Sequence, residues 1–330
     1  MTRADIAAAI LWTGATLYAI FGGADFGAGF WDLIAGDAEK GWRPRTLIQR
    51  SLTPVWEANH VWLIFILVVL WTAFPDAFGA IMSTLYVPLT LAAFGIVLRG
   101  AGFAFRKPLR SLQAQRAMGA TFALSSVLTP FFMGTVVGAI AAGNVPPGGG
   151  DAFSSWLQPL PLLIGAMFVA SGAYLAAVFL VGDARRAEPE LEGYFVRRAL
   201  GAALVAGAFA VAGIFALHSE AGYVYDRLID QGLPLVIVSA ICGIGVLASL
   251  LRGWRRPLRP LAAGAVAAVI WGWGVAQFPY LLPTSLKIAQ SAAPADTLGA
   301  VIVVFLAAAV ICLPALALLY WLSQRELLGE

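Results

Sequence analysis

The sequence predicts an all-α, polytopic membrane protein in which nine transmembrane helices are joined by short connections. Three observations lead to this fold class. Hydrophobic residues make up 60% of the 330-residue chain and charged residues only 12%, whereas soluble domains carry about a quarter charged residues. The apolar residues occur in runs of roughly twenty, the length that a helix needs to cross a bilayer core. Basic residues are concentrated in alternate connections, as expected when those connections share one side of a membrane.

The apolar runs place nine spans along the chain. We expect them at residues 5–33, 55–74, 78–99, 117–142, 157–181, 199–218, 233–251, 260–281 and 297–322. No connection is long enough to hold a soluble domain, so residues 1–330 are expected to form a single integral membrane domain. Two four-helix groups plus a ninth helix would fit this number. A membrane β-barrel would show short segments of alternating polarity, and these Ala-, Leu- and Gly-rich runs do not alternate.

The distribution of lysine and arginine predicts the orientation of the spans. Eighteen of these residues lie in the connections after the odd-numbered spans, the last span included, and only Arg3, Arg227 and Lys287 lie on the opposite side. The positive-inside rule then places the N-terminus outside and the C-terminus in the cytoplasm. The formal net charge of +3 therefore reflects topology, and no nucleic-acid partner is expected.

One ionisable residue lies deep in the first span. Asp25 stands about 10 Å from the cytoplasmic end of this helix if Asp32 marks that end. A charged group inside a span is costly, which favours a functional role, although a carboxylate held by hydrogen bonds to neighbouring helices is the alternative. Asp32 lies two turns further along the same side, so the two would form an acidic track towards the cytoplasm. The glycines that flank Asp25 would let another helix approach closely.

A second group of polar residues begins the second span. Trp56, Glu57 and His60 stand three or four residues apart, so their side chains can meet on one helix face. The helix dipole explains Glu57 and the membrane interface explains Trp56, but neither explains Glu57, Asn59 and His60 together ahead of such an apolar run. A buried carboxyl group and an imidazole suit proton transfer near neutral pH. Spacing alone leaves a functional and a structural role equally open.

Two further groups of residues have structural interpretations. The aromatic residues around Pro279 suit an interfacial belt, and this proline should end or kink the eighth helix. Arg99 and Arg106, with Lys107, close the third span, and we interpret them as charges that anchor that span at the membrane interface.

The chain is poor in residues that bind metals or cofactors. It has two histidines, His60 and His218, whereas a membrane cytochrome that holds two haems by paired histidines needs about four. Its two cysteines, Cys242 and Cys312, lie far apart inside apolar runs, where buried structural thiols are expected. No nucleotide-binding motif or metal-type cluster is present. His60 with one of the five Met residues could still hold one haem, but nothing in the sequence places them together. We therefore expect no metal, no ligated cofactor and no catalysis by this chain alone.

Five segments carry the motifs of a known family. They are Gly23-Ala24-Asp25-Phe26-Gly27-Ala28-Gly29, Pro54-Val55-Trp56-Glu57-Ala58-Asn59-His60-Val61-Trp62-Leu63, Trp71-Thr72-Ala73-Phe74-Pro75, Arg99-Gly100-Ala101-Gly102-Phe103-Ala104-Phe105-Arg106 and Phe278-Pro279-Tyr280-Leu281-Leu282-Pro283-Thr284-Ser285. In this order they resemble subunit II of the cytochrome bd family of quinol-oxidising terminal oxidases. The resemblance covers most of the chain, and residues 143–260 carry little of it.

The resemblance implies a heterodimer in the plasma membrane of a prokaryote. In that family, subunit I carries haem b, haem d and the quinol-oxidising loop, while subunit II packs against it without ligating haem. Electrons from quinol reduce O2 to water in the respiratory chain, and the protons for water come from the cytoplasm. Some members also hold a structural quinone in subunit II. Membrane lipid and small accessory membrane subunits complete the implied partners.

The resemblance also assigns roles by motif position. It implies proton transfer by Asp25 and Glu57. Asp32, Trp56 and His60, singled out above by their spacing, are candidate supporting residues. Some members have Asp in place of Glu57 and Gln in place of His60; a longer carboxylate should still relay protons, whereas His60 has no assured role. A different functional class, a proton-coupled secondary transporter, would use the same two carboxylates. An odd number of spans fits the inverted repeats of such transporters poorly.

Overall fold

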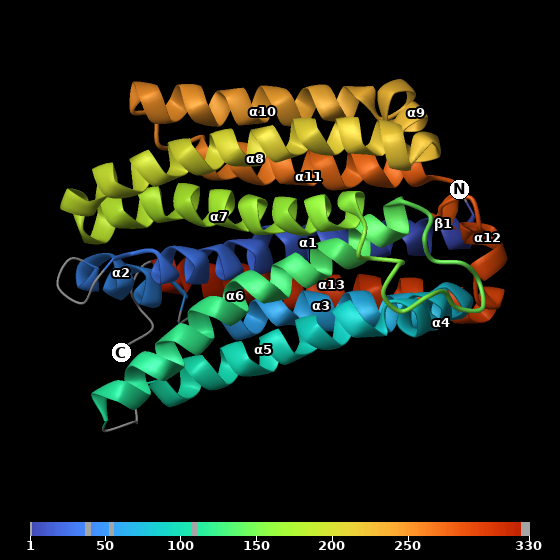
Figure 1. Ribbon diagram of the computed structural model, residues 1–330, viewed down its shortest axis with the longest axis horizontal. Helices are drawn as coiled ribbons and strands as arrows, with labels where there is room; N and C mark the ends of the chain where they lie inside the picture. Colours follow the sequence, from blue (N-terminus) through green and yellow to red (C-terminus); the bar gives the residue numbers. More distant parts are fainter. Residues whose placement is uncertain (1, 37–40, 53–55, 107–110, 325–330) are drawn as a thin grey trace.

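The computed structural model is an almost entirely helical bundle, elongated along its helices (Figure 1). It describes residues 2–36, 41–52, 56–106 and 111–324. In chain order the elements are α1 (Arg3–Leu33), α2 (Trp42–Leu52), α3 (Trp56–Ala73), α4 (Pro75–Thr84), α5 (Tyr86–Arg106), α6 (Leu112–Ala141), α7 (Pro159–Ala187), η1 (Pro189–Leu191), α8 (Glu192–Glu220), α9 (Gly222–Asp230), α10 (Leu233–Arg252), α11 (Leu258–Gln277), β1 (Tyr280–Leu282), β2 (Leu286–Lys287), α12 (Ile288–Ser291) and α13 (Ala295–Gln324).

The number of membrane-crossing helices agrees with the prediction if one bent pair counts as a single span. Among the described residues, eight helices are long and apolar enough to cross a membrane, namely α1, α5, α6, α7, α8, α10, α11 and α13. The ninth span is the pair formed by α3 and α4, whose axes meet at 119°. Pro75 is the first residue of α4. A proline fits a first helical turn but cannot continue the ladder of a preceding helix, so α3 ends here.

The third span is the main correction to the predicted boundaries. The sequence predicts it at residues 78–99, but α4 occupies Pro75–Thr84 as a separate short helix and α5 extends to Arg106. Hydropathy measures apolar length but not direction, so the apolar residues of α4 were assigned to a membrane crossing. They pack into the core at one end of the bundle instead, with Ala77 and Ile81 buried. As a result, Arg99 lies seven residues, about 10 Å, inside α5 rather than at its end.

The helices form two groups that meet where α1 and α6 pack on α7. The first group contains α1, α3, α5 and α6, the second contains α7, α8, α10 and α11, and α13 packs on α1 and α3. Two indole N–H groups tie α1 to the second group. Trp31 donates to the carbonyl of Ala173 over 2.8 Å, and Trp12 donates to the carbonyl of Ile270 over 3.2 Å. The arrangement is therefore two four-helix groups plus a ninth helix.

Glycines allow α1 to touch both α7 and α6 at the depth of Asp25. A Cβ atom on Gly27 would collide with the carbonyl group of Gly172 in α7, and a Cβ atom on Gly29 would collide with Ser126 in α6. The small-residue face predicted around Asp25 is thus the packing face of α1. Because these glycines carry no side chain of their own, α1 lies directly against the backbone of α7 and the Ser126 side chain of α6.

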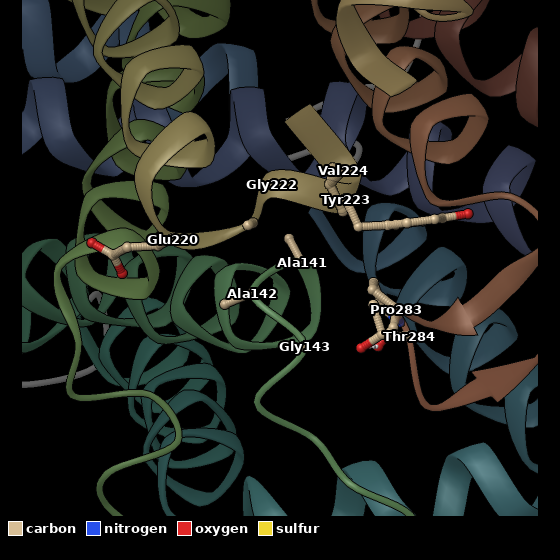
Figure 2. Close-up of a pocket in the computed structure, with 10 residues that line it drawn as sticks. Ala141, Ala142, Gly143, Glu220, Gly222, Tyr223, Val224, Pro283 and Thr284 are labelled. Atoms are coloured by element: carbon tan, nitrogen blue, oxygen red, sulfur yellow. Dashed lines mark hydrogen bonds between the residues drawn. The ribbon is translucent and has the colours of Figure 1, made fainter. Parts of the chain in front are cut away.

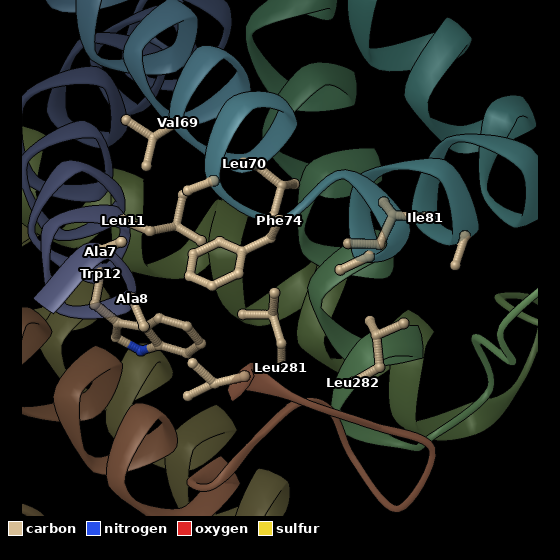
Figure 3. Close-up of a cluster of buried hydrophobic side chains, with 14 of the residues drawn as sticks. Ala7, Ala8, Leu11, Trp12, Val69, Leu70, Phe74, Ile81, Leu281 and Leu282 are labelled. Carbon is tan, nitrogen blue, oxygen red and sulfur yellow. The ribbon is translucent and has the colours of Figure 1, made fainter. Parts of the chain in front are cut away.

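A cluster of apolar side chains closes the end of the bundle where α1 begins. Figure 3 shows Leu11 and Trp12 of α1 facing Phe74 at the bend between α3 and α4, with Leu281 and Leu282 of β1 on the other side. Phe74 is completely buried. Phe74 therefore joins this cluster at the point where the chain bends from α3 into α4.

The eighth span ends just before Pro279, as predicted from this proline. Helix α11 stops at Gln277, two residues before Pro279, and the chain then forms the antiparallel β1–β2 hairpin. The side chain of Gln277 is buried and donates from Nε2 to the carbonyl of Leu281 over 2.5 Å. This bond ties the last residue of α11 to the first strand of the hairpin.

Basic side chains gather at one end of the bundle. This basic end contains α2 and the connections from α7 to α8 and from α10 to α11, and α1 and α13 both finish there (Figure 1). Ion pairs join its elements: Arg43 of α2 lies 3.3 Å from Glu188 and 2.8 Å from Glu190, and Arg255 lies 2.6 Å from Glu192. The assignment of this end to the cytoplasm remains a prediction from the positive-inside rule.

Candidate functional site

Asp25 is buried in the membrane-spanning part of α1. It lies eight residues, about 12 Å, before the end of α1 at Leu33. Its side chain is 1% exposed. A carboxylate at this depth requires compensation of its charge, because an isolated buried charge is strongly unfavourable.

The compensating group is Arg99 of α5. Its Nη1 donates to Asp25 Oδ2 over 2.8 Å, and its Nη2 donates to the main-chain carbonyl of Asp25 over 3.1 Å. The Arg99 side chain is 2% exposed, so both partners of the ion pair are buried. The interpretation of Arg99 as an interfacial anchor is therefore wrong. The side chain of Arg106 and the whole of Lys107, interpreted in the same way, lie outside the described residues.

Helix α6 completes the surroundings of the guanidinium group. Arg99 Nε donates to Ser126 Oγ over 3.0 Å, and Ser126 Oγ in turn donates to the carbonyl of Phe122 over 2.7 Å. The rings of Phe26 and Phe122 lie against the guanidinium, with their centroids 4.8 Å and 5.0 Å from Cζ. Hydrogen bonds and cation–π contacts therefore hold Arg99 in a single position between α1 and α6.

The two oxygens of the Asp25 carboxylate differ in their environment. Oδ2 accepts from Arg99, whereas Oδ1 is buried and has no hydrogen-bond partner among the described residues. Buried polar atoms are normally paired, so an exception needs an explanation. A carboxylate with one bound and one open oxygen can take a proton without losing its cation.

Asp32 lies between Asp25 and the basic end, as the predicted acidic track requires. Its side chain is 4% exposed, and Arg45 of α2 places its Nε 3.8 Å from Asp32 Oδ1. Arg45 Nη2 also donates to the carbonyl of Gly36 over 2.5 Å. Asp25 and Asp32 are seven residues apart, about 10 Å along α1, and each faces an arginine from another helix.

His60 belongs to the same region of the molecule. Its imidazole ring is 5.8 Å from the ring of Phe26 and 6.3 Å from the ring of Tyr18, both in edge-to-face geometry. Phe26 also lies against Arg99, so a single aromatic ring contacts both the guanidinium and the imidazole. The structure thus brings His60 close to the Asp25–Arg99 pair, although these residues come from three different helices.

Glu57 and Trp56 occupy the first turn of α3, three and four residues before His60. The positions of their side chains lie outside the described part of the chain, as do residues 53–55 just before them. Asn59, which follows two residues after Glu57, is buried. The proton-transfer role assigned to Glu57 therefore remains a prediction.

A separate cavity of about 180 Å³ lies at the opposite end of the bundle (Figure 2). Most of its lining comes from small residues and backbone at the ends of α6 and α8. Its polar side chains already have partners: Glu220 accepts from the N–H of Leu160 over 3.2 Å, and Tyr223 donates to the carbonyl of Phe278 over 3.1 Å. Burial raises the pKa of the Tyr223 phenol. This cavity is remote from Asp25 and offers no comparable chemistry.

Comparison with known proteins decides the family. The family model for cytochrome bd terminal oxidase subunit II matches residues 3–323. This chain belongs to the cytochrome bd terminal oxidase subunit II family. It is thus a polytopic protein of the bacterial plasma membrane and part of a respiratory oxidoreductase complex. Membership of a subunit II family implies a subunit I partner.

Individual relatives of this subunit II agree with the family match. The putative cytochrome bd menaquinol oxidase subunit II of Bacillus subtilis strain 168 is 23% identical over 341 residues, 98% of this chain and 96% of the relative. The cytochrome bd-I ubiquinol oxidase subunit 2 of Escherichia coli strain K12 is 26% identical over 319 residues, 83% and 80% of the two chains. In the solved structure of bd oxidase from Geobacillus thermodenitrificans, one chain is similar with a TM-score of 0.84 and 25% identity, over 98% of both chains.

The histidines of this subunit II do not fit a shared haem. His60 lies near the start of α3 at the basic end, whereas His218 lies in the last turn of α8 at the opposite end, where its ring is 4.5 Å from that of Tyr225. One iron cannot bind both imidazoles. Within the described residues, no group of three or more His, Cys, Asp or Glu side chains is placed to hold a metal ion.

Arg99 is the site residue of this subunit II that the sequence did not predict. The misplaced third span put it at a helix end, where an arginine needs no partner. Two features of the sequence indicated that Arg99 lies inside a span. An aspartate inside a span requires a cation, and Arg99 is followed directly by Gly100-Ala101-Gly102. Such small residues favour close helix packing rather than a helix end. In the structure, a Cβ atom on Gly102 would lie 2.9 Å from the Met118 carbonyl oxygen of α6.

Proposed function

We propose that this chain acts as subunit II of a quinol oxidase by supporting a haem-bearing subunit I and by passing protons from the cytoplasm into the complex. The relatives named above are a menaquinol oxidase subunit and a ubiquinol oxidase subunit, which supports a quinol as the electron donor. The chain would not be catalytic alone. Haem b and haem d, bound by subunit I, would supply the electron transfer and the oxygen chemistry.

The observation that carries this proposal is the carboxylate of Asp25. It is buried about 12 Å from the basic end of α1, its charge is compensated by Arg99, and Oδ1 has no hydrogen-bond partner among the described residues. Formation of water from O2 consumes protons, and a membrane-embedded carboxylate with an open oxygen is suited to deliver them.

The neighbouring residues connect Asp25 to the basic end. Asp32 would receive protons near the basic end. Asp25 would then accept them seven residues, or about two helical turns, deeper in α1. Glu57 and Trp56 begin α3 beside this region, and His60 lies within ring contact of Phe26. We assign Glu57 the second carboxylate role and treat Asp32, Trp56 and His60 as supporting residues.

Purification of the tagged chain from its host membrane tests the proposed assembly. An oxidase subunit should carry with it a partner that gives a haem signal in the reduced-minus-oxidised absorption spectrum. A proton-coupled transporter would come as a colourless single chain, which would contradict the proposal. A structural quinone, if this chain holds one, should appear in the organic extract of the same preparation.

Replacement of Glu57 by glutamine should lower quinol-driven oxygen uptake about tenfold, because glutamine keeps the shape of the side chain but cannot carry a proton. The measurement is oxygen consumption per haem in the purified complex. Asp76→Asn serves as the matched control, since Asp76 is an exposed carboxylate in the first turn of α4, at the opposite end of the bundle. Equal rates for Glu57→Gln and wild type at equal haem content would remove Glu57 from the route.

A further inference from the structure

We infer that Arg99 is the positioning residue of the proton route: it clamps one oxygen of Asp25 so that the other stays open for proton exchange. The inference rests on the proposed proton-transfer function of Asp25. It assigns to α5 a part in proton delivery that neither the motif resemblance nor the family match attributes to it.

The geometry of the clamp is specific to a guanidinium group. Three N–H groups of Arg99 reach three acceptors: Nη1 reaches Asp25 Oδ2, Nη2 reaches the Asp25 carbonyl, and Nε reaches Ser126 Oγ. The first two acceptors belong to the same residue, so they fix the carboxylate relative to its own backbone. A lysine ammonium is a point charge that cannot span these acceptors in a planar fork.

The packing around Arg99 leaves it no alternative position. The rings of Phe26 and Phe122 flank its guanidinium, and the side chain is 2% exposed. Ser126 is held in turn by its own hydrogen bond to Phe122. Arg99 is therefore a fixed part of the α1–α5–α6 interface, and the orientation of the Asp25 carboxylate follows from it.

Other ion pairs in the described part of the chain differ from this one. Asp183 accepts from both Arg259 and Arg186, at 2.6 Å and 2.7 Å, but these side chains are 22 to 50% exposed. Water can replace any of those partners, so the orientation of Asp183 is not set by one cation. In the Asp25–Arg99 pair, by contrast, both side chains are at most 2% exposed.

The clamp has a direct consequence for proton transfer. A proton arriving from the basic end binds to Asp25 Oδ1 and forms a neutral carboxyl group, while Oδ2 keeps its hydrogen bond to Arg99. The same proton then leaves Oδ1 for the next acceptor, and the carboxylate is restored without any change in the number of electrons. Without Arg99 the carboxylate would rotate and expose either oxygen, so transfer through the fixed position would slow.

Four variants of the assembled oxidase complex test this inference: Arg99→Lys, Arg99→Gln, Asp25→Asn and the double variant Asp25→Asn with Arg99→Gln. For each, quinol-driven oxygen uptake per haem, the KM for quinol and the ratio of rates in H2O and D2O are measured. The double variant removes both buried charges together, so it reports on function even if Arg99→Gln alone leaves too little folded complex. Arg259→Gln is the matched control, because it breaks an interhelical Arg–Asp pair away from Asp25.

We expect Arg99→Lys and Arg99→Gln to lower kcat about tenfold or more, to leave the KM for quinol unchanged and to raise the H2O/D2O rate ratio, because proton transfer becomes limiting. The double variant should be no slower than Asp25→Asn alone, since Arg99 acts through Asp25. Arg259→Gln should match wild type in all three readouts.

Two results would overturn the inference while leaving the proposed function in place. One is a wild-type rate and isotope ratio in Arg99→Lys and Arg99→Gln when Asp25→Asn is impaired. The other is a double variant about tenfold slower than Asp25→Asn, because Arg99 would then act independently of Asp25. A wild-type rate in Asp25→Asn would instead contradict the proposed function itself, and the inference would fail with it.

Discussion

Replacement of Asp25 by asparagine is expected to lower quinol-driven oxygen uptake about a hundredfold at unchanged haem content. Asparagine has nearly the same shape as aspartate and can still accept a hydrogen bond from Arg99, but it cannot take up and release a proton. The quinol-binding part of the complex should be unaffected, so the KM for quinol should stay the same. Oxygen consumption per haem in the purified complex is the measurement.

The control for this variant is Asp183→Asn. Asp183 also pairs with arginine, at 2.6 Å from Arg259, but it is partly exposed at the basic end and belongs to α7. We expect full oxygen uptake from it. If Asp25→Asn keeps wild-type uptake with a normal haem content, Asp25 is a structural residue and this chain is a scaffold without a part in proton transfer.

Replacement of Gly27 by leucine is expected to prevent assembly of the complex. A Cβ atom at this position would overlap the carbonyl group of Gly172 and the backbone of Ala173 in α7, neither of which can move aside like a flexible side chain. Overpacking usually destabilises by about 1–3 kcal/mol, and separating two helix backbones should exceed that range. The amount of haem-containing complex recovered from membranes gives the measurement.

Gly193→Leu is the matched control for the assembly prediction, because a Cβ atom on Gly193, near the start of α8, would meet no atom within 4 Å. It should yield the normal amount of complex. Normal recovery of Gly27→Leu would contradict the close α1–α7 contact.

Most of the fold could be predicted from apolar length and charge distribution. These two signals gave nine spans, and the structure has eight long apolar helices plus the bent pair of α3 and α4. The third span was misplaced because α4 is as apolar as a membrane helix but turns into the core after Phe74. Pro75 marks the end of α3, but at the turn Phe74 packs in one cluster with Leu281 and Leu282, which lie about two hundred residues later in the chain. A local pattern therefore reveals the break and not the direction of the turn.

The candidate site was only partly predictable for a related reason. Asp25 stood out because a carboxylate inside a span has no local explanation, and the structure shows it buried beside the predicted glycine face. Its partner Arg99 was missed because pairing between α1 and α5 depends on the exact end of the third span. Counting charges along the sequence treats every arginine near a helix end as an interfacial anchor. In the structure, the 2% exposure of the Arg99 side chain shows that it is a buried counter-ion.

We propose that this subunit carries protons from the basic end into the oxidase through Asp25. The most direct test is proton uptake during a single turnover, when the reduced complex reacts with O2 in the presence of a pH-indicator dye. We expect Asp25→Asn to slow the uptake of protons about a hundredfold relative to wild type, with the haem content unchanged. Proton uptake at the wild-type rate in this variant would show that protons do not pass through Asp25.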